Sequence, residues 1–397
     1  MAGTEPIRRI ARADGAVRYR LVVDVGRRAD GRRDQRTSTH STFKEARAEL
    51  SRIRHEVNRA TYVPPIAQTL EQYLDGWLPG AQRRVRPSTF RGYVDALKPV
   101  REQLGRHRLQ QLSKSNIDTL VDNLLTSGRR IGGKGRPLNP RTVTLTLTIL
   151  RMALEDALRE GRVARNVAKL VDAPKRVHRD MKTWTADEAK AFLVVALGDR
   201  LAPAWLLSLY GMRRGEVLGL RWSDVDLEQR TVTISQTRAS VGGTLVVTSE
   251  PKTARGRRQL PLDAGVCAAL KSLLARQAAE KRFAGGAYRT KGLVIVNELG
   301  EPVRPEWYSD RFARLARTAG VPAIRLHNAR HTAATLLHLR GVPLAVISAW
   351  LGHADPAFTL RTYAKSQADM LREASVVLGD AIGSGSGIEA VGVTGSG

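Results

Sequence analysis

The sequence predicts a multidomain α+β protein: a small three-stranded sheet with one helix, then an all-α module, then a mainly α part containing a small antiparallel sheet. Residues 16–25 and 36–43 have strand-like composition around a Gly- and Asp-rich turn. Residues 69–172 show helical periodicity, and strand-like segments return only between 225 and 262. A chain of 397 residues is long enough for two or three domains with separate cores.

Composition changes along the chain predict where these parts begin and end. We expect an N-terminal domain at 1–63, an all-α module at 64–179, a larger domain at 180–383 and a flexible tail at 384–397. Pro64 and Pro65 mark the first linker, and the tail is rich in Gly and Ser.

The first part is basic. Its helix is expected to begin at Thr42, with Glu45 completing a capping box. Arginines surround the predicted strands: Arg18, Arg20, Arg27, Arg28, Arg32 and Arg33. Such a sheet could lay its strands in a DNA groove, or it could be a solvated sheet that packs on the rest of the protein.

Capping residues mark the predicted helix starts and ends in the second part. Helix starts are predicted at Ser88, at Ser115 with Asp118, and at Asn139 followed by Pro140, with ends at Gly105, Gly128 and Gly161. Residues 142–150 alternate as a strand would, but the Asn-Pro start and the unbroken run to residue 161 favour a helix. The Gly-rich basic segment 128–141 is predicted to be either a phosphate-contacting loop or a disordered connector.

The third part mixes helices and strands. A capping box at Thr185 and Glu188 predicts a helix, and residues 215–222 predict another. Residues 225–262 predict one three-stranded antiparallel sheet with turns at 228–229 and 242–243. Further helices are expected at 263–283, 305–319, 327–340, 343–351 and 356–363.

The charge balance indicates a polyanionic partner. The formal net charge is +27, from 65 basic and 38 acidic residues. Charge alone does not imply an enzyme, because nucleoid-structuring proteins share it. Cys267 is the sole cysteine, which excludes an internal disulfide or a cysteine metal cage, and its apolar helical setting predicts a packed thiol. Neither a membrane-length apolar run nor a signal sequence is evident, so we expect a cytoplasmic protein without a membrane partner.

Polar landmarks occur in a fixed order in the second half of the chain. They are Gly-Met-Arg-Arg-Gly-Glu at 211–216, Lys252 in a basic strand-like segment, His-Asn-Ala-Arg at 327–330, Leu-Gly-His at 351–353, and Tyr363. Together they supply two guanidiniums, an ammonium, two imidazoles and a phenol. These groups can break a phosphodiester with a protein side chain, and they imply no metal and no cofactor.

Each group has a chemical role in such a reaction. Arg213 and Arg330 can bind two phosphate oxygens and stabilise a pentacoordinate phosphorane. Tyr363 can act as the nucleophile once its phenol, with an ordinary pKa of about 10, is deprotonated. Arg213 is preferred over Arg214 because Arg-x-x-Glu spacing puts it on one helical face with Glu216.

The remaining groups can move protons. His327 and His353 can accept the phenol proton or donate to the phosphate, since imidazole does both near neutral pH. Lys252 is the natural general acid for the leaving 5′-oxygen, because neighbouring guanidiniums would lower its pKa. Arg255, Arg257 and Arg258 follow closely and leave that assignment open.

Taken singly, every landmark has an ordinary structural explanation. His-x-x-Arg is common on helices, and a lone tyrosine is more often a half-buried anchor. Leu-Gly-His alone predicts a helix C-cap with Gly352 in the left-handed conformation. Their joint occurrence in order favours catalysis.

The stretches YGMRRGEVLGLRWSDVDL, SEPKTARGRRQLPL and RLHNARHTAATLLHLRGVPLAVISAWLGHADPAFTLRTYAK resemble the signature boxes of the tyrosine recombinases, the phage-integrase family. The resemblance spans roughly residues 180–380. It implies the catalytic set Arg213, Lys252, His327, Arg330, His353 and Tyr363, with Glu216 orienting Arg213. Asn328 and Ala329 replace the Asp-Leu that is frequent in the family, and neither carries the chemistry.

The resemblance implies an integrase that cleaves and rejoins double-stranded DNA at attachment sites through a 3′-phosphotyrosyl bond. The front sheet resembles an arm-type DNA-binding domain, and the helical module resembles a core-binding, SAM-like domain. Implied partners are a homotetramer on DNA and accessory DNA-bending and directionality factors. The apolar stripe after Tyr363 predicts a helix that either packs on its own domain or is donated to the next subunit, and the resemblance favours donation. The alternatives are a type IB topoisomerase-like enzyme and a non-catalytic DNA-binding protein that retains the fold.

Overall fold

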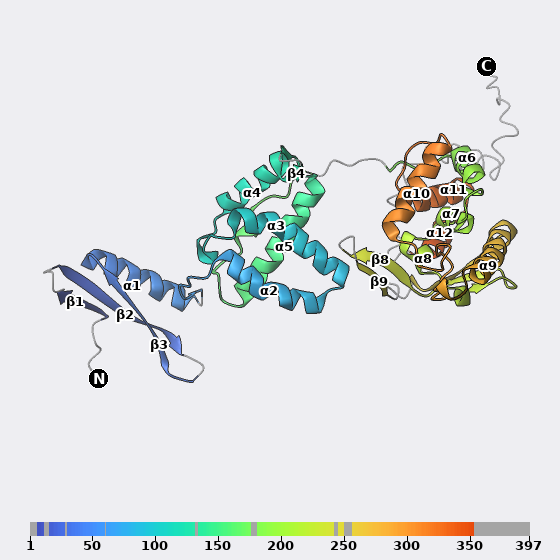
Figure 1. Cartoon of the computed structure of the whole chain (residues 1–397). Helices are drawn as coiled ribbons and strands as arrows, with labels where there is room; N and C mark the ends of the chain where they lie inside the picture. The colour runs from blue at the N-terminus through green and yellow to red at the C-terminus, as the bar shows by residue number, and fades with distance from the viewer. Residues whose placement is uncertain are drawn as a thin grey trace, which may run out of the picture. The chain divides into compact units, whose positions relative to one another are not determined.

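The computed structural model describes residues 6–11, 16–27, 30–59, 61–131, 134–175, 181–241, 245–249 and 256–352. The chain divides into two compact units, residues 1–178 and 179–397 (Figure 1). The first unit contains two separate hydrophobic cores, one under the N-terminal sheet and one among the helices that follow. The finer division into four segments stays a prediction.

The N-terminal part is a three-stranded antiparallel sheet covered by one helix, as predicted. Strands β1 (Ile7–Ala11), β2 (Val17–Arg27) and β3 (Arg33–His40) pair in that order, and α1 (Phe43–Asn58) packs against them (Figure 1). Leu21, Val23, Leu50 and Ile53 form the core between sheet and helix. β3 alternates between exposed and half-buried residues because one of its faces lies toward the helix.

The predicted capping box of α1 is half correct. The Thr42 hydroxyl accepts from the Glu45 amide at 3.2 Å, as expected. The Glu45 carboxylate, however, accepts from the amide of Ser41 and not from that of Thr42. The Glu45 side chain therefore binds the amide one residue before the N-cap, and not the N-cap amide that a capping box uses.

The second part of this unit is the predicted helical module. Its helices are α2 (Leu70–Arg84), α3 (Pro87–Leu104), α4 (Lys114–Ser127) and α5 (Pro140–Arg159), with 3-10 turns η1 (Leu109–Gln111) and η2 (Val167–Leu170). Their apolar faces share one core that includes Leu74, Leu97, Ile117 and Leu150.

Two helix starts in this module differ from the prediction. Ser88 lies inside α3, whose N-cap is Arg86, because Pro87 supplies the fixed φ angle that suits a first helical position. The cap of α4 is Ser113 and not Ser115. The Ser113 side chain accepts from the Asn116 amide, and the Asn116 side chain accepts from the Ser113 amide. The reciprocal pair satisfies two amides that Ser115 could not reach.

Asn139 and Pro140 do begin a helix, and residues 142–150 are helical as predicted. The hydroxyls of Thr144 and Thr148 each donate to the carbonyl four residues earlier. Their alternating polarity is therefore compatible with a helix, because these side chains find acceptors on the helix itself.

The Gly-rich segment between α4 and α5 contains a two-stranded hairpin of β4 (Arg129–Ile131) and β5 (Lys134–Arg136). Its described residues are therefore not the disordered connector that was one predicted alternative, and contact with phosphate stays a prediction. Gly135 lies against α4, where an added Cβ would be 2.7 Å from the Ser127 Cβ. The missing side chain lets the hairpin pack on the helix.

The second unit is built around an aromatic core. Its helices are α6 (Ala186–Ala196), α7 (Ala202–Leu209), α8 (Arg214–Gly219), α9 (Ala264–Ala284), α10 (Pro305–Thr318), α11 (Leu326–Leu339) and α12 (Leu344–Leu351). The capping box of Thr185 and Glu188 is confirmed. The rings of Trp205 and Tyr308 stack with centroids 4.4 Å apart. Cys267 is buried in this core, as predicted.

The strands of this unit form two sheets where the sequence predicted one. β6 (Val225–Asp226), β7 (Thr231–Ile234) and β10 (Arg258–Pro261) make a sheet in the order β10-β7-β6. β8 (Thr237–Val241) and β9 (Leu245–Ser249) pair separately as a hairpin. The turn at 228–229 is confirmed, since the Asp226 carboxylate accepts from both amides there.

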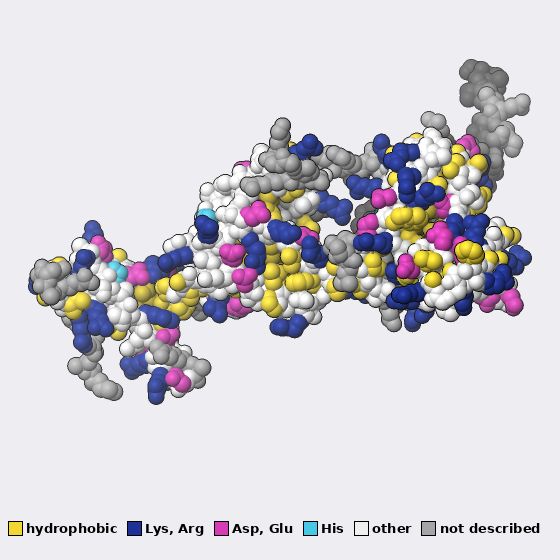
Figure 2. Space-filling model, in the orientation of Figure 1, with side chains coloured by type: hydrophobic (Ala, Val, Ile, Leu, Met, Phe, Trp, Pro, Cys, Tyr) yellow, Lys and Arg dark blue, Asp and Glu magenta, His cyan; other side chains and the backbone are white. Residues whose placement is uncertain are grey.

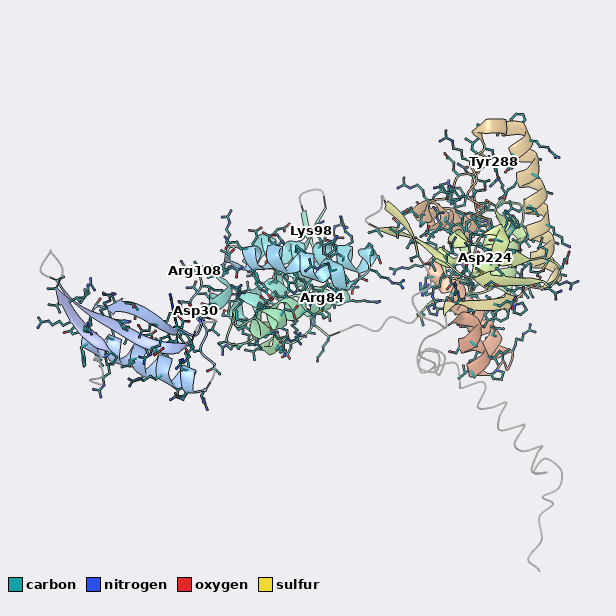
Figure 3. The ribbon with its side chains drawn as sticks, turned by 90° about the horizontal axis from the view of Figure 1, so that it is seen from below. Asp30, Arg84, Lys98, Arg108, Asp224 and Tyr288 are labelled. Atoms are coloured by element: carbon teal, nitrogen blue, oxygen red, sulfur yellow. The ribbon has the colours of Figure 1, made fainter. Side chains whose placement is uncertain are left out.

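Packing on α8 explains the separate hairpin. A Cβ added at Gly215 would lie 2.9 Å from the Arg238 carbonyl oxygen, and one at Gly219 would lie 3.0 Å from that of Gln236. The two glycines let the β8 backbone lie directly against the helix. Asp224, labelled in Figure 3, closes the adjoining 3-10 turn η3 (Trp222–Asp224) by accepting from Arg221 and Ser235.

The helix predicted at 356–363 lies outside the described residues. Among the residues that the structure describes, no helix is both long enough and apolar enough to cross a membrane. Figure 2 shows Lys and Arg side chains, in dark blue, distributed over the visible face of both units.

Candidate active site

Arg213 and Glu216 form the predicted pair at the start of α8. Arg213 is the N-cap residue, and its Nη1 donates to Glu216 Oε1 at 2.7 Å. Glu216 Oε2 accepts from the Arg213 amide at 2.9 Å. Arg214 takes another direction, and its guanidinium donates to the Ser309 hydroxyl and the Pro305 carbonyl of α10. The spacing argument for Arg213 over Arg214 therefore agrees with the local geometry.

Arg330 is held by the backbone from two sides. It lies on α11 with only 2% of its surface exposed. Its Nη1 donates to the Gly211 carbonyl at 2.6 Å, and its Nη2 donates to the Leu351 carbonyl. Gly211 has a φ angle of +90°. This conformation, which disfavours side chains, lets the turn before Arg213 approach α11.

The carboxyl end of α12 brings the two arginines together. Arg213 Nη2 donates to the Gly352 carbonyl at 3.1 Å, next to the Leu351 carbonyl that Arg330 uses. Gly352 is the left-handed C-cap that the sequence predicts, with φ 61° and ψ 49°. Because a helix C-terminus carries partial negative charge, it attracts both guanidiniums. Adjacent carbonyls thus hold two side chains that are far apart in sequence.

His327 joins this group from the first turn of α11, on the same face as Arg330. Burial lowers the pKa of His327, and the charges of Arg330 and Arg213 lower it further. The imidazole is therefore neutral at physiological pH. A neutral ring keeps one unprotonated nitrogen that can accept a proton.

Sequence reasoning missed His331, the next histidine on this helix. Its ring meets that of His327 edge to face, with centroids 5.0 Å apart. Burial, then His327 and Arg330, lower the pKa of His331 to about 4. A second imidazole directly after Arg330 was visible in the sequence, but the His-x-x-Arg spacing selected His327 and gave no reason to add His331.

Arg258 was also missed as a member of the site. Its Nη1 and Nη2 donate to the two carboxylate oxygens of Glu216, at 3.2 and 3.0 Å. Its Nε donates to the Trp350 carbonyl at 2.7 Å. In the sequence Arg258 was one of several basic residues after Lys252, and nothing there distinguished it.

The described residues account for Arg213, His327 and Arg330 of the predicted set, and these three lie together. Lys252, His353 and Tyr363 lie outside the described residues. In the chain, Lys252 falls between β9 and β10, and His353 directly follows Gly352. Within the described ranges, no three His, Cys, Asp or Glu side chains are grouped as metal ligands would be.

The described part of the site thus holds two buried or half-buried guanidiniums beside a neutral imidazole, and these groups could bind a phosphate. Residues 184–370 match the phage integrase family model, and residues 69–125 match the N-terminal SAM-like domain of phage integrases. The chain belongs to the phage integrase family, and it is a tyrosine-type site-specific recombinase.

Full-length relatives agree with this membership. The chain is 27% identical over 371 residues to a tyrosine recombinase XerC-like protein of Caldanaerobacter subterraneus subsp. tengcongensis, covering 88% of this chain and 93% of the relative. It is 26% identical over 390 residues to an integrase of Streptomyces ambofaciens, covering 94% of this chain and 97% of that protein.

Solved structures show the same fold. The Tn1549 transposon integrase in complex with a circular intermediate DNA matches with a TM-score of 0.62 at 20% identity, covering 77% of this chain and 99% of that one. A lambda integrase tetramer bound to a Holliday junction matches with a TM-score of 0.52 at 18% identity, covering 91% and 96%. The predicted tyrosine recombinase fold is thereby confirmed.

Proposed function

We propose that this recombinase cleaves DNA with Tyr363 while Arg213 and Arg330 bind the scissile phosphate, and that it integrates and excises a phage or other mobile element. One observation carries the assignment of the arginines. Their guanidiniums donate to the adjacent carbonyls of Gly352 and Leu351, so two forked cations converge beside His327. Two such cations match the non-bridging oxygens of one phosphate.

The two arginines contribute differently. The Arg213 side chain is 38% exposed and can meet DNA directly, whereas Arg330 is 2% exposed. A buried cation acts at a lower effective dielectric, where it stabilises a developing negative charge more strongly than it would in water. Arg213 therefore binds and orients the phosphate, and Arg330 stabilises the pentacoordinate state from within the protein.

The chemistry is a pair of transesterifications. The Tyr363 oxygen attacks phosphorus, the bond from phosphorus to the 5′-oxygen breaks, and a 3′-phosphotyrosyl bond forms. Neutral His327, with His353, accepts the phenol proton, while Lys252 protonates the leaving 5′-oxygen. A 5′-hydroxyl of the partner duplex then attacks the same phosphorus and releases the tyrosine. The bond energy is kept throughout, so no ATP is needed.

The front parts of the chain select the DNA site in this proposal. The basic N-terminal sheet binds arm-type DNA, and the helical module binds the core site beside the scissile phosphate. Exchange proceeds through a Holliday junction in a homotetramer in the bacterial cytoplasm, with accessory bending and directionality factors. The net charge of +27 and the likeness to a lambda integrase named as a tetramer on a Holliday junction support this arrangement.

A nicked suicide substrate tests the nucleophile. The nick lets the short 5′-hydroxyl fragment leave, so covalent protein–DNA adducts accumulate with the native chain. Tyr363→Phe should abolish adducts and keep DNA binding in a gel shift. Adducts that persist in this variant would refute the assignment, and binding without adducts in the native chain on its own site would favour a non-catalytic DNA-binding protein.

A further inference from the structure

We propose that Arg258 is a positioning residue for DNA cleavage, which holds Arg213 and the end of α12 in place through Glu216 and the Trp350 carbonyl. The inference rests on the proposed role of Arg213 in binding the scissile phosphate. It adds a residue that acts through its neighbours and does not itself touch DNA.

The contacts of Arg258 use the whole guanidinium. Nη1 and Nη2 span the two carboxylate oxygens of Glu216, at 3.2 and 3.0 Å, and Nε donates to the Trp350 carbonyl at 2.7 Å. The side chain is 8% exposed. A planar fork that is bonded on three nitrogens and buried has one orientation, and a lysine cannot reproduce it.

Glu216 connects this fork to Arg213. The carboxylate is 2% exposed and receives Arg213 from the start of α8 and Arg258 from the start of β10. Burial by itself would raise the pKa of Glu216, but Arg258, and then Arg213, bring it below its usual value. These two guanidiniums are the charged groups that face Glu216 among the described residues. Arg258 therefore keeps Glu216 ionised, and the ionised carboxylate orients Arg213.

The end of α12 receives a set of three arginines. The consecutive carbonyls of Trp350, Leu351 and Gly352 accept from Arg258, Arg330 and Arg213, respectively. The last carbonyls of a helix lack intrahelical partners, so they are free to accept such donors. Of these three arginines, Arg258 lies at the start of β10, the strand that follows the chain segment with Lys252. It thus ties the backbone before His353 to the strand that follows Lys252.

A positioning role predicts a changed pH profile, which a purely structural contact does not. In the native chain the pKa of Glu216 is depressed, so the carboxylate stays ionised to a lower pH than that of an ordinary glutamate. In Arg258→Gln the buried carboxyl loses its stronger partner and its pKa rises. It then becomes protonated at a higher pH than in the native chain, and Arg213 loses its anchor there. Cleavage should therefore decline as the pH is lowered, earlier than in the native enzyme.

The experiment measures the single-turnover rate of adduct formation on a nicked suicide substrate, with saturating full-length protein and a pH series from mildly acidic to mildly basic. Arg258→Gln should be roughly 10- to 100-fold slower at neutral pH, a loss typical of small misplacements in a site, with DNA affinity unchanged. Glu216→Gln/Arg258→Gln should lack the new acid decline, because its residue 216 cannot titrate. Arg276→Gln, which removes an exposed cation from α9, should match the native chain.

Several outcomes would overturn the inference. A native rate and pH profile in Arg258→Gln would do so, as would an acid decline that survives in the double variant. If thermal melting shows that Arg258→Gln is not folded, Arg258→Lys is measured in its place, because it keeps the charge and loses the planar fork. A native cleavage rate in Arg258→Lys would contradict the proposal. Adducts formed by Tyr363→Phe would instead overturn the proposed function, and this inference with it.

Discussion

The guanidinium of Arg330 donates a 2.6 Å hydrogen bond to the carbonyl of Gly211, which lies only two residues before Arg213. The position of Arg330 is thus coupled to the backbone that carries Arg213, the other arginine proposed to bind the phosphate. The second branch of the Arg330 fork reaches the Leu351 carbonyl. Helix α11, the turn before α8 and the end of α12 are joined at one side chain.

Replacing that fork by a single ammonium tests the coupling. Arg330→Lys should leave one of two buried carbonyls without its donor, at a cost of about 1–3 kcal/mol in unfolding free energy. Adduct formation should drop about 100-fold or more, because the preorganised guanidinium that stabilises the pentacoordinate state is lost. Urea unfolding and suicide-substrate assays measure the two effects. Arg317→Lys, exposed on α10, serves as the control, and a native cleavage rate in Arg330→Lys would contradict the role.

Gly211 should tolerate no side chain. Its φ angle is +90°, and an added Cβ would lie 2.7 Å from Leu351 Cδ2. Gly211→Ala should lower the unfolding free energy by about 2–4 kcal/mol, from backbone strain plus the displaced leucine. Gly320→Ala is the matched control, because its φ angle is +67° and no atom lies within 4 Å of the added Cβ. Equal losses in the two variants would show that contact with Leu351 does not matter.

His331 should make stability depend on pH. Its folded-state pKa is lowered to about 4, below an unfolded value of about 6.5. Between these values the unfolded chain binds more protons, so the His331 contribution is fully present above about pH 6.5 and is lost as the pH falls toward 4. The loss is at most about 3 kcal/mol. Urea unfolding at several pH values gives the unfolding free energy as a function of pH. This free energy should change less with pH in His331→Gln than in the native chain, and an equal pH dependence in the two would refute the assignment.

Recombination, as opposed to general DNA relaxation, predicts site choice. Sequencing the DNA ends trapped on Tyr363 from a genomic library should recover one short shared sequence. A supercoiled plasmid that lacks this sequence should stay supercoiled, because cleavage requires the DNA-binding parts to engage their site. Relaxation of such a plasmid would support a type IB topoisomerase-like enzyme.

Local signals in the sequence predicted most of the helices. Asn139 with Pro140, and Thr185 with Glu188, begin helices because a cap is settled by residues two or three positions apart. The error at Ser115 arose because Ser113, two residues earlier, has a better reciprocal partner in Asn116. The pairing of Arg213 with Glu216 was predictable for the same local reason.

The strands were predicted less well. Their composition was clear, but the division into β10-β7-β6 and the hairpin β8–β9 depends on contact between β8 and the glycines of α8. The hairpin β4–β5 similarly depends on close packing of Gly135 on α4. Pairing partners of strands are set by distant surfaces, which no short sequence window contains.

By itself, the sequence determined the chemistry available to this protein: its family, its basic charge, and the order of the side chains that are proposed to act on DNA. Only the tertiary structure decided that the last carbonyls of α12 hold Arg213, Arg258 and Arg330, and that His331 lies against His327. The reason is physical. Residue type and local spacing are written along the chain, whereas buried hydrogen bonds between residues far apart in sequence exist only after the helices have packed.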